Sequence, residues 1–150
     1  MGLAIATMAA AAPSASAETV TFSTPFAGDV VNTCTLEDVA ITGTLHMKDT
    51  ANITLDSTKT QLEINTTNVS GTTPLGVKYT MNSQYSEIQH ASGDDAQQTV
   101  EQTLNMTRQG EMGTFLPGPG DDLRVHMLVH ITTTNGVPTA TTDNFRSDCR

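Results

Sequence analysis

Residues Val39 to Met47 read V-A-I-T-G-T-L-H-M, a stretch in which apolar and polar side chains alternate. Successive side chains of an extended chain point to opposite faces, so alternate residues share a face. One face would carry Val39, Ile41, Gly43, Leu45 and Met47. The other would carry Thr42, Thr44 and His46. A period of two with one apolar face is typical of an antiparallel strand that covers a core on one side.

The same alternation recurs on both sides of this stretch, in the segments 18–24, 53–56, 62–66, 77–81, 100–106 and 125–131, and the segment 137–141 follows as a further predicted strand. The chain contains 27 threonines, and a β-branched side chain suits the exposed side of a pleated sheet. The chain has no internal repeat and no linker between two cores. We therefore predict an all-β fold, a single antiparallel β-barrel or sandwich of about eight strands.

Turn signals separate these segments. Asn135-Gly136 lies between two of them and is typical of a type I′ hairpin, because both residues tolerate a positive φ. Longer loops are predicted at Pro25–Asp38, His90–Ala96 and Gln109–Asp122. The segment 121–130 could also form a short helix capped by an aspartate, but the β-branched run and Asn-Gly turn that follow it favour a strand.

The first seventeen residues predict a signal peptide. Residues Met1–Ala17 read MGLAIATMAAAAPSASA, and Ala15-Ser16-Ala17 matches the small-residue cleavage site of a signal peptidase. The positive segment that normally opens a signal peptide is missing, which suggests a true start upstream of Met1. A flexible alanine-rich tail is the alternative. We expect a leader at 1–17, a single β domain at 18–150, and a secreted, periplasmic or cell-surface protein.

The charge balance excludes two function classes. The chain has 150 residues, the size of one domain, and carries 16 acidic against 7 basic residues, a formal net charge of −9. Proteins that bind nucleic acids or anionic membranes carry a basic patch, so we expect neither partner. The apolar run 3–12 is too short to cross a bilayer as a helix, so no membrane span is predicted.

The cysteines agree with export. The chain has two, Cys34 and Cys149, and an even number in an exported chain favours a disulfide. Their wide separation excludes a CxxC redox motif or a zinc knuckle. We therefore predict a Cys34–Cys149 disulfide.

Several short motifs resemble those of a group of uncharacterised secreted bacterial proteins. They are Asn32-Thr-Cys34, Gly43-Thr-Leu-His46, Asp143-Asn-Phe-Arg146 and the terminal Cys149-Arg150. The resemblance implies an exported, disulfide-closed β fold of bacterial origin. It implies no activity and no catalytic residue.

The histidines are the candidate chemical groups, with His46, His126 and His130 as possible acids or bases and His90 as the fourth. In a strand, His126 and His130 would share one face and lie about 13 Å apart, too far to bind one metal ion. In a helix they would lie one turn apart and could share a metal. We predict no metal site and no cofactor.

Other motifs are weaker. Asp94-Asp95 and Asp121-Asp122 could bind calcium, but neither has EF-hand spacing. The chain contains no nucleophile elbow, Walker loop or dinucleotide-binding fingerprint. Four glycosylation triplets begin at Asn52, Asn65, Asn68 and Asn105, and they matter only if the host glycosylates.

Two function classes remain. The first is a non-enzymatic exported module that binds a small apolar ligand or an envelope component. The second is a small exported enzyme, a barrel-type cyclase or hydrolase that uses histidines as acid and base. Histidines that converge with Arg124 or Tyr79 in an enclosed pocket would favour the enzyme, and histidines scattered on an outer face would favour the binding module.

Overall fold

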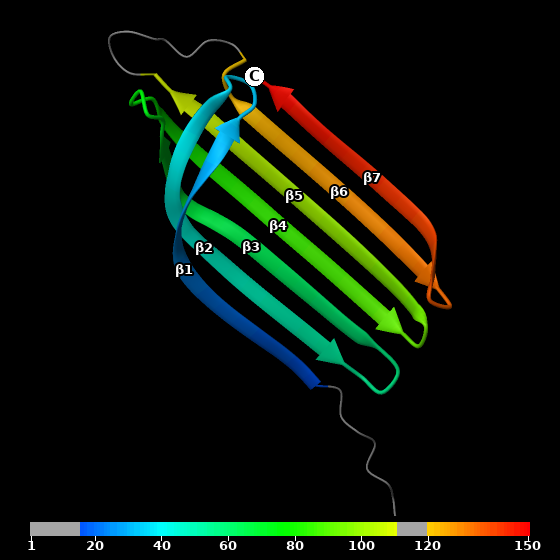
Figure 1. Ribbon diagram of the computed structural model, residues 1–150. Coiled ribbons are helices and arrows are strands. Elements are labelled where there is room, and N and C mark those ends of the chain that lie inside the picture. Colours follow the sequence, from blue (N-terminus) through cyan, green and yellow to red (C-terminus); the bar gives the residue numbers. More distant parts are fainter. Residues whose placement is uncertain (1–15, 111–119) are drawn as a thin grey trace, which may run out of the picture.

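The computed structural model describes residues 16–110 and 120–150, which form one antiparallel sheet (Figure 1). Each strand pairs with its neighbours in the sequence, in the order β1-β2-β3-β4-β5-β6-β7. The strands are β1 (Ser16–Asn32), β2 (Glu37–Ile53), β3 (Thr58–Thr72), β4 (Lys78–Ser92), β5 (Asp95–Gln109), β6 (Leu123–Thr134) and β7 (Val137–Cys149). The all-β prediction is confirmed. The sheet is not closed, because β1 and β7 lie at its two edges and do not pair.

The sheet separates apolar from polar side chains. Residues that are paired across strands share a face, so the register assigns each side chain. Ile41 pairs with Gly71, Gly71 with Tyr79, and Met81 with Met106, which places the buried side chains on one side. We call this side the inner face. The outer face carries mainly threonine, asparagine, glutamine, histidine and lysine.

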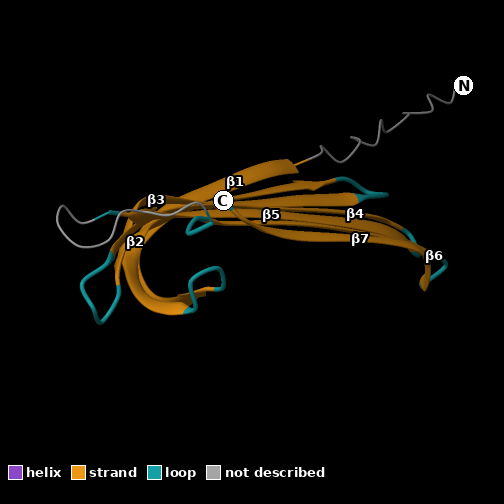
Figure 2. Ribbon diagram, turned by 90° about the horizontal axis from the view of Figure 1, so that it is seen from above, coloured by secondary structure: helices purple, strands orange, loops and turns teal. Residues whose placement is uncertain are grey.

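One end of the β1–β2 hairpin curls over the inner face. The first residues of β2 that pair with β3 are Ala40 and Ile41, so residues 29–39 belong only to the hairpin. We call these residues the hook, and Figure 2 shows the curl of β1 and β2 back under the sheet. The hook and the strand ends beneath it enclose the core, which consists of Val39, Ile41, Val69, Tyr79, Met106 and Leu123.

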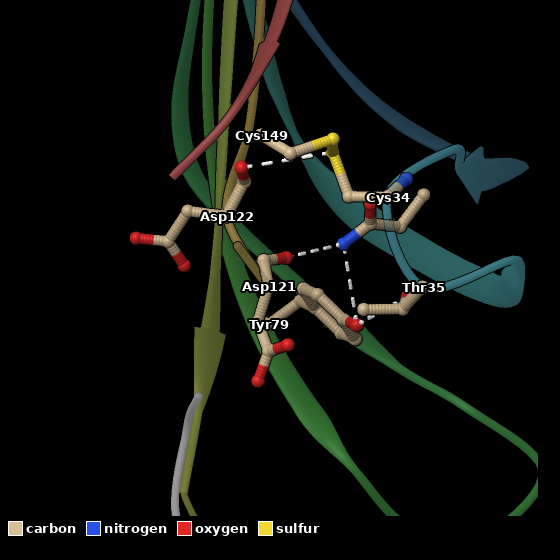
Figure 3. Close-up of a disulfide and its surroundings, with 7 residues drawn as sticks. Cys34, Thr35, Tyr79, Asp121, Asp122 and Cys149 are labelled. Carbon is tan, nitrogen blue, oxygen red and sulfur yellow. Dashed lines mark hydrogen bonds between the residues drawn. A yellow bond between two sulfur atoms is a disulfide. The ribbon is translucent and has the colours of Figure 1, made fainter. Parts of the chain in front are cut away.

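The disulfide closes the hook. Cys34, in the turn of the hook, is bonded to Cys149 at the end of β7, as predicted from the sequence (Figure 3). Asn32 orders this turn, because its Oδ1 accepts the Cys34 N–H at 2.9 Å and its Nδ2 donates to the Asp121 carbonyl at 2.8 Å. The hairpin from one sheet edge is therefore joined to the strand at the other edge.

Several sequence predictions need correction. The barrel and the two-sheet sandwich are replaced by one open sheet, because β1 and β7 do not pair. The sheet has seven strands rather than about eight, because the predicted 53–56 segment is the end of β2 and the turn that follows it. The prediction of a loop at Pro25–Asp38 is wrong, since strands occupy all of this segment except residues 33–36. The loop at His90–Ala96 is also wrong, since only Gly93 and Asp94 lie between β4 and β5. Both errors arose because exposed strands tolerate polar residues, proline and glycine.

Two further predictions are confirmed, and two predicted segments lie mostly outside the described residues. Residues 121–130 lead into and form most of β6, which confirms the strand rather than the helix. Asn135 and Gly136 both have positive φ in the β6–β7 hairpin, as predicted. Most of the 109–122 loop and of the 1–17 leader lies outside the described residues, although Ser16 and Ala17 begin β1.

Candidate functional site

The inner face is uncovered beyond the hook. Large apolar side chains at or next to the sheet edges remain at least half exposed there: Val20 and Phe22 on β1, Ile53 at the end of β2, and Phe145 on β7. Between them lie half-buried apolar side chains of the middle strands: Met47, Leu62, Ile64, Tyr85, Val100, Met127, Val129 and Ile131. Isolated exposed apolar residues are ordinary, but a contiguous apolar surface marks a place where something binds.

A shallow hollow of about 220 Å³ lies at the end of the inner face far from the hook. Its lining includes the inner-face residues Thr58, Thr60, Gln89, Ala91, Ala96 and Gln98. Small side chains occur together here, because Thr58 pairs with Ala91 and Ala91 pairs with Ala96. The hollow is therefore a consequence of side-chain size within a continuous sheet.

Glu87 stands between the hollow and the apolar centre of the inner face. Its neighbours in the sheet are Leu62 on β3 and Val100 on β5, both apolar. Three neutral donors hold its carboxylate. The Tyr85 hydroxyl donates to Oε2 at 2.7 Å, Gln98 Nε2 donates to Oε1 at 2.8 Å, and Gln89 Nε2 also donates to Oε1.

These hydrogen bonds keep Glu87 ionised. The Tyr85 hydroxyl makes the largest contribution, and together with the two amides it lowers the pKa of Glu87 below 4.5, against a smaller opposing effect of burial. The same contact raises the pKa of Tyr85, because the phenol would have to ionise beside a carboxylate. In the described part of the chain, no ion pair involves Glu87.

The cations are segregated from this carboxylate. On the seven strands, Arg108 is the sole lysine, arginine or histidine whose register places it on the inner face, and it lies under the hook. The others are on the outer face: Lys48, Lys59, Lys78, Arg124, Arg146 and all four histidines. The inner face also carries Asp49 and Asp143, in the same cross-strand row as Glu87. The charged side chains that the strands place on the open part of the inner face are therefore all acidic.

A second polar cluster lies beneath the hook, around Tyr79. The Tyr79 hydroxyl donates to Glu37 Oε2 and contacts Thr35 Oγ1 at 3.2 Å. Arg108 contacts the Glu37 carboxylate at 3.2 Å and Asp121 at 3.5 Å. Each of these groups has partners inside the protein, and Tyr79 is only 1% exposed. We assign this cluster to fastening the hook.

Burial and hydrogen bonds have opposite effects on the pKa of Glu37 in this cluster. Burial would raise the pKa of Glu37, but hydrogen bonds from Tyr79 and Arg108 outweigh it and leave the pKa lowered. Burial raises the pKa of Tyr79, and the neighbouring Glu37 carboxylate raises it further. The cluster therefore holds an ionised Glu37, a neutral Tyr79 and a charged Arg108.

The histidines do not converge. His46 lies on β2 between Ser23 Oγ and Thr67 Oγ1, at 2.7 and 2.8 Å. His126, on β6, faces Glu101 at 3.4 Å, and three strands separate it from His46. His130 contacts Thr99 Oγ1 at 2.8 Å, and it shares the outer face with His126, as the strand alternation predicted.

The remaining candidates also lie apart. Tyr79 is on the inner face under the hook, whereas Arg124 is on the outer face. Arg124 lines an outer-face groove of about 290 Å³ with His126, Asn144, Arg146, Asp148 and Arg150. His90 is exposed near the β4–β5 turn and is also among the residues that line the 220 Å³ hollow. The structure therefore does not bring Arg124 or Tyr79 together with two histidines in one enclosed site.

The paired aspartates take part in turns. The Asp94 carbonyl and the Asp95 carboxylate accept backbone N–H groups of Gly136 and Asn135. The Asp122 carboxylate accepts the Arg108 N–H at 2.9 Å. Within residues 16–110 and 120–150, no three histidine, cysteine, aspartate or glutamate side chains gather as metal ligands. The asparagines of the four glycosylation triplets are all exposed.

Searches of protein-family models, of curated proteins and of solved structures found no match to this chain. Among the residues that the structure describes, no helix is long and apolar enough to span a membrane. The candidate site is therefore assigned from the geometry of this chain alone.

Sequence reasoning missed Glu87. The predicted segment 77–81 ends at Met81, whereas β4 continues through Ser92. Had the period of two been extended from Tyr79, it would have placed Tyr85, Glu87 and Gln89 on the apolar face. A glutamate at an apolar-face position is the signal that could have identified the site.

Proposed function

We propose that this protein is a non-enzymatic, exported binding module of bacterial origin that takes a small apolar ligand on the open part of its inner face. The observation that carries the proposal is the contiguous apolar surface that the hook leaves uncovered. Phe22 is 50% exposed and Phe145 is 65% exposed, one on each edge strand of this surface. Covering such area with an apolar ligand yields about 25 cal/mol per Å² removed from water.

The arrangement of the histidines favours binding over catalysis. An acid–base enzyme needs both groups within hydrogen-bond reach of one substrate, directly or through one water. His46 and His126 lie four strand positions apart on the outer face, about 19 Å at the spacing of neighbouring strands. The cyclase or hydrolase alternative therefore has less support than the binding module.

Two residues of β6 provide the test. Ile131 lies on the inner face and lines the hollow, whereas Leu128 lies on the outer face, and both are half-buried in the same strand. Ile131→Gln should weaken binding of 1-octanol, measured by calorimetry on the full oxidised chain, by about tenfold, because the ligand then covers a polar side chain.

Leu128→Gln is the matched control and should leave the affinity unchanged. Binding that is insensitive to Ile131→Gln, or equally weakened by Leu128→Gln, would place the ligand elsewhere. Absence of any octanol binding would contradict the proposed function itself.

A further inference from the structure

An ionised carboxylate on an apolar surface is costly unless something offsets its charge. Glu87 is such a group, with Leu62 and Val100 as its direct neighbours across the sheet. Its three hydrogen-bond partners, Tyr85, Gln89 and Gln98, are all neutral. They fix the position of the carboxylate but leave its negative charge uncompensated.

The partners of Glu87 also connect it to the hollow. Gln89 and Gln98 donate to Glu87, and the same two side chains line the 220 Å³ hollow. A molecule whose apolar body lies in the hollow would thus have its polar end within reach of the carboxylate. An interaction between two charged groups in such partly apolar surroundings is stronger than the same interaction in water.

We propose that the ligand of the inner face carries a cationic amine, which Glu87 binds while the apolar body of the ligand lies over the hollow and its apolar surroundings. This inference rests on the proposed function and specifies the chemical class of the ligand. The inner face supplies the complementary charge, because Asp49 and Asp143 lie in the same row as Glu87, two and three strands away, and the cations of the strands, Arg108 apart, lie on the outer face.

A second copy of the chain fits this surface poorly. Two inner faces packed against each other would place Asp49, Glu87 and Asp143 of both copies in one interface, with no inner-face strand cation other than Arg108 to pair with them, and like charges in an interface oppose association. An apolar cation avoids this repulsion. The charge on the inner face thus favours an amphiphilic amine as its occupant.

The test compares three probes that share an eight-carbon chain: n-octylammonium, 1-octanol and n-octyl sulfate. Calorimetry on the full oxidised chain at neutral pH should give octylammonium about tenfold tighter binding than octanol, and octyl sulfate the weakest binding. Glu87→Gln should remove the tenfold advantage of the ammonium and leave octanol binding unchanged.

Glu101→Gln is the matched control, because it removes the same charge from the outer face of the neighbouring strand β5. It should leave the preference for ammonium intact. If Glu101→Gln weakens octylammonium as much as Glu87→Gln does, the preference reflects the overall charge of −9 and the assignment to Glu87 is wrong.

The failures of the two proposals can be distinguished. Equal affinity for all three probes would overturn the cation assignment while leaving the apolar site in place. Absence of binding by all three would overturn both. Circular dichroism of each variant checks that the sheet is intact, so that a loss of binding is not a loss of fold.

Discussion

Two tyrosines of β4 lie on the same face and donate to a glutamate, but in different surroundings. Tyr79 is 1% exposed and donates to Glu37 under the hook, whereas Tyr85 is half-buried and donates to Glu87 on the open face. Removing a hydroxyl from a buried cluster leaves its partners unsatisfied, whereas water can replace a hydroxyl at an open surface. The two residues thus separate a structural role from a binding role.

We expect Tyr79→Phe to reduce the free energy of unfolding by about 1–3 kcal/mol, because Glu37, Thr35 and Asn32 lose a common hydrogen-bond partner. Tyr85→Phe should cost less than about 1 kcal/mol, since water can reach Glu87. Urea denaturation of the two variants beside the parent checks both values. Equal losses in the two variants would show that the Tyr79 cluster does not fasten the hook.

At the scale of elements, the hook depends on glycine in β3. A Cβ at Gly71 would lie 2.5 Å from Cγ1 of Val39 and 3.1 Å from Cγ2 of Ile41, closer than packed atoms allow. The backbone of β3 at Gly71 therefore leaves the space that these core side chains of β2 occupy. Gly28 in β1 offers a comparison, because a Cβ there would meet nothing within 4 Å.

We expect Gly71→Ala to destabilise the fold by about 1–3 kcal/mol, because Val39 and Ile41 must move away from the core to make room. Gly28→Ala should be neutral or slightly stabilising, since alanine restricts the unfolded chain without a clash. Thermal unfolding followed by circular dichroism compares the two. A Gly71→Ala protein as stable as the Gly28→Ala protein would mean that the hook packs more loosely than the distances indicate.

The elements also show what the sequence could and could not predict. The period of two identified the inner and outer faces, because side-chain direction is a local property of a strand. Strand ends were harder to predict, since β1 continues through Pro25 and Gly28 and β4 through His90. Whether the sheet closes into a barrel was not predictable, because no local sequence pattern indicates whether β1 and β7 pair. Glu87 was accessible in principle, but its three partners come from two strands and depend on register.

At the scale of the whole molecule, the disulfide substitutes for the missing pairing between the sheet edges. Only six apolar side chains are buried in the core that the structure describes, and the rest of the sheet is a single layer (Figure 2). Cys34 and Cys149 are separated by 115 residues, so their bond constrains most of the unfolded chain. The chain-entropy estimate for such a loop is about 4–5 kcal/mol.

We therefore expect the double variant Cys34→Ser with Cys149→Ser to lose about 4 kcal/mol of unfolding free energy, as measured by urea denaturation under oxidising conditions. The loss should begin at the hook, because residues 29–39 pair with no strand outside their own hairpin. Amide hydrogen exchange should then accelerate at Val39 before it accelerates at Val100, which lies within β5 between two paired strands. The parent protein treated with reductant serves as the control and should match the double variant. Unchanged exchange at Val39 in both samples would mean that the Tyr79 cluster holds the hook without the disulfide, and that the sheet edges need no covalent link.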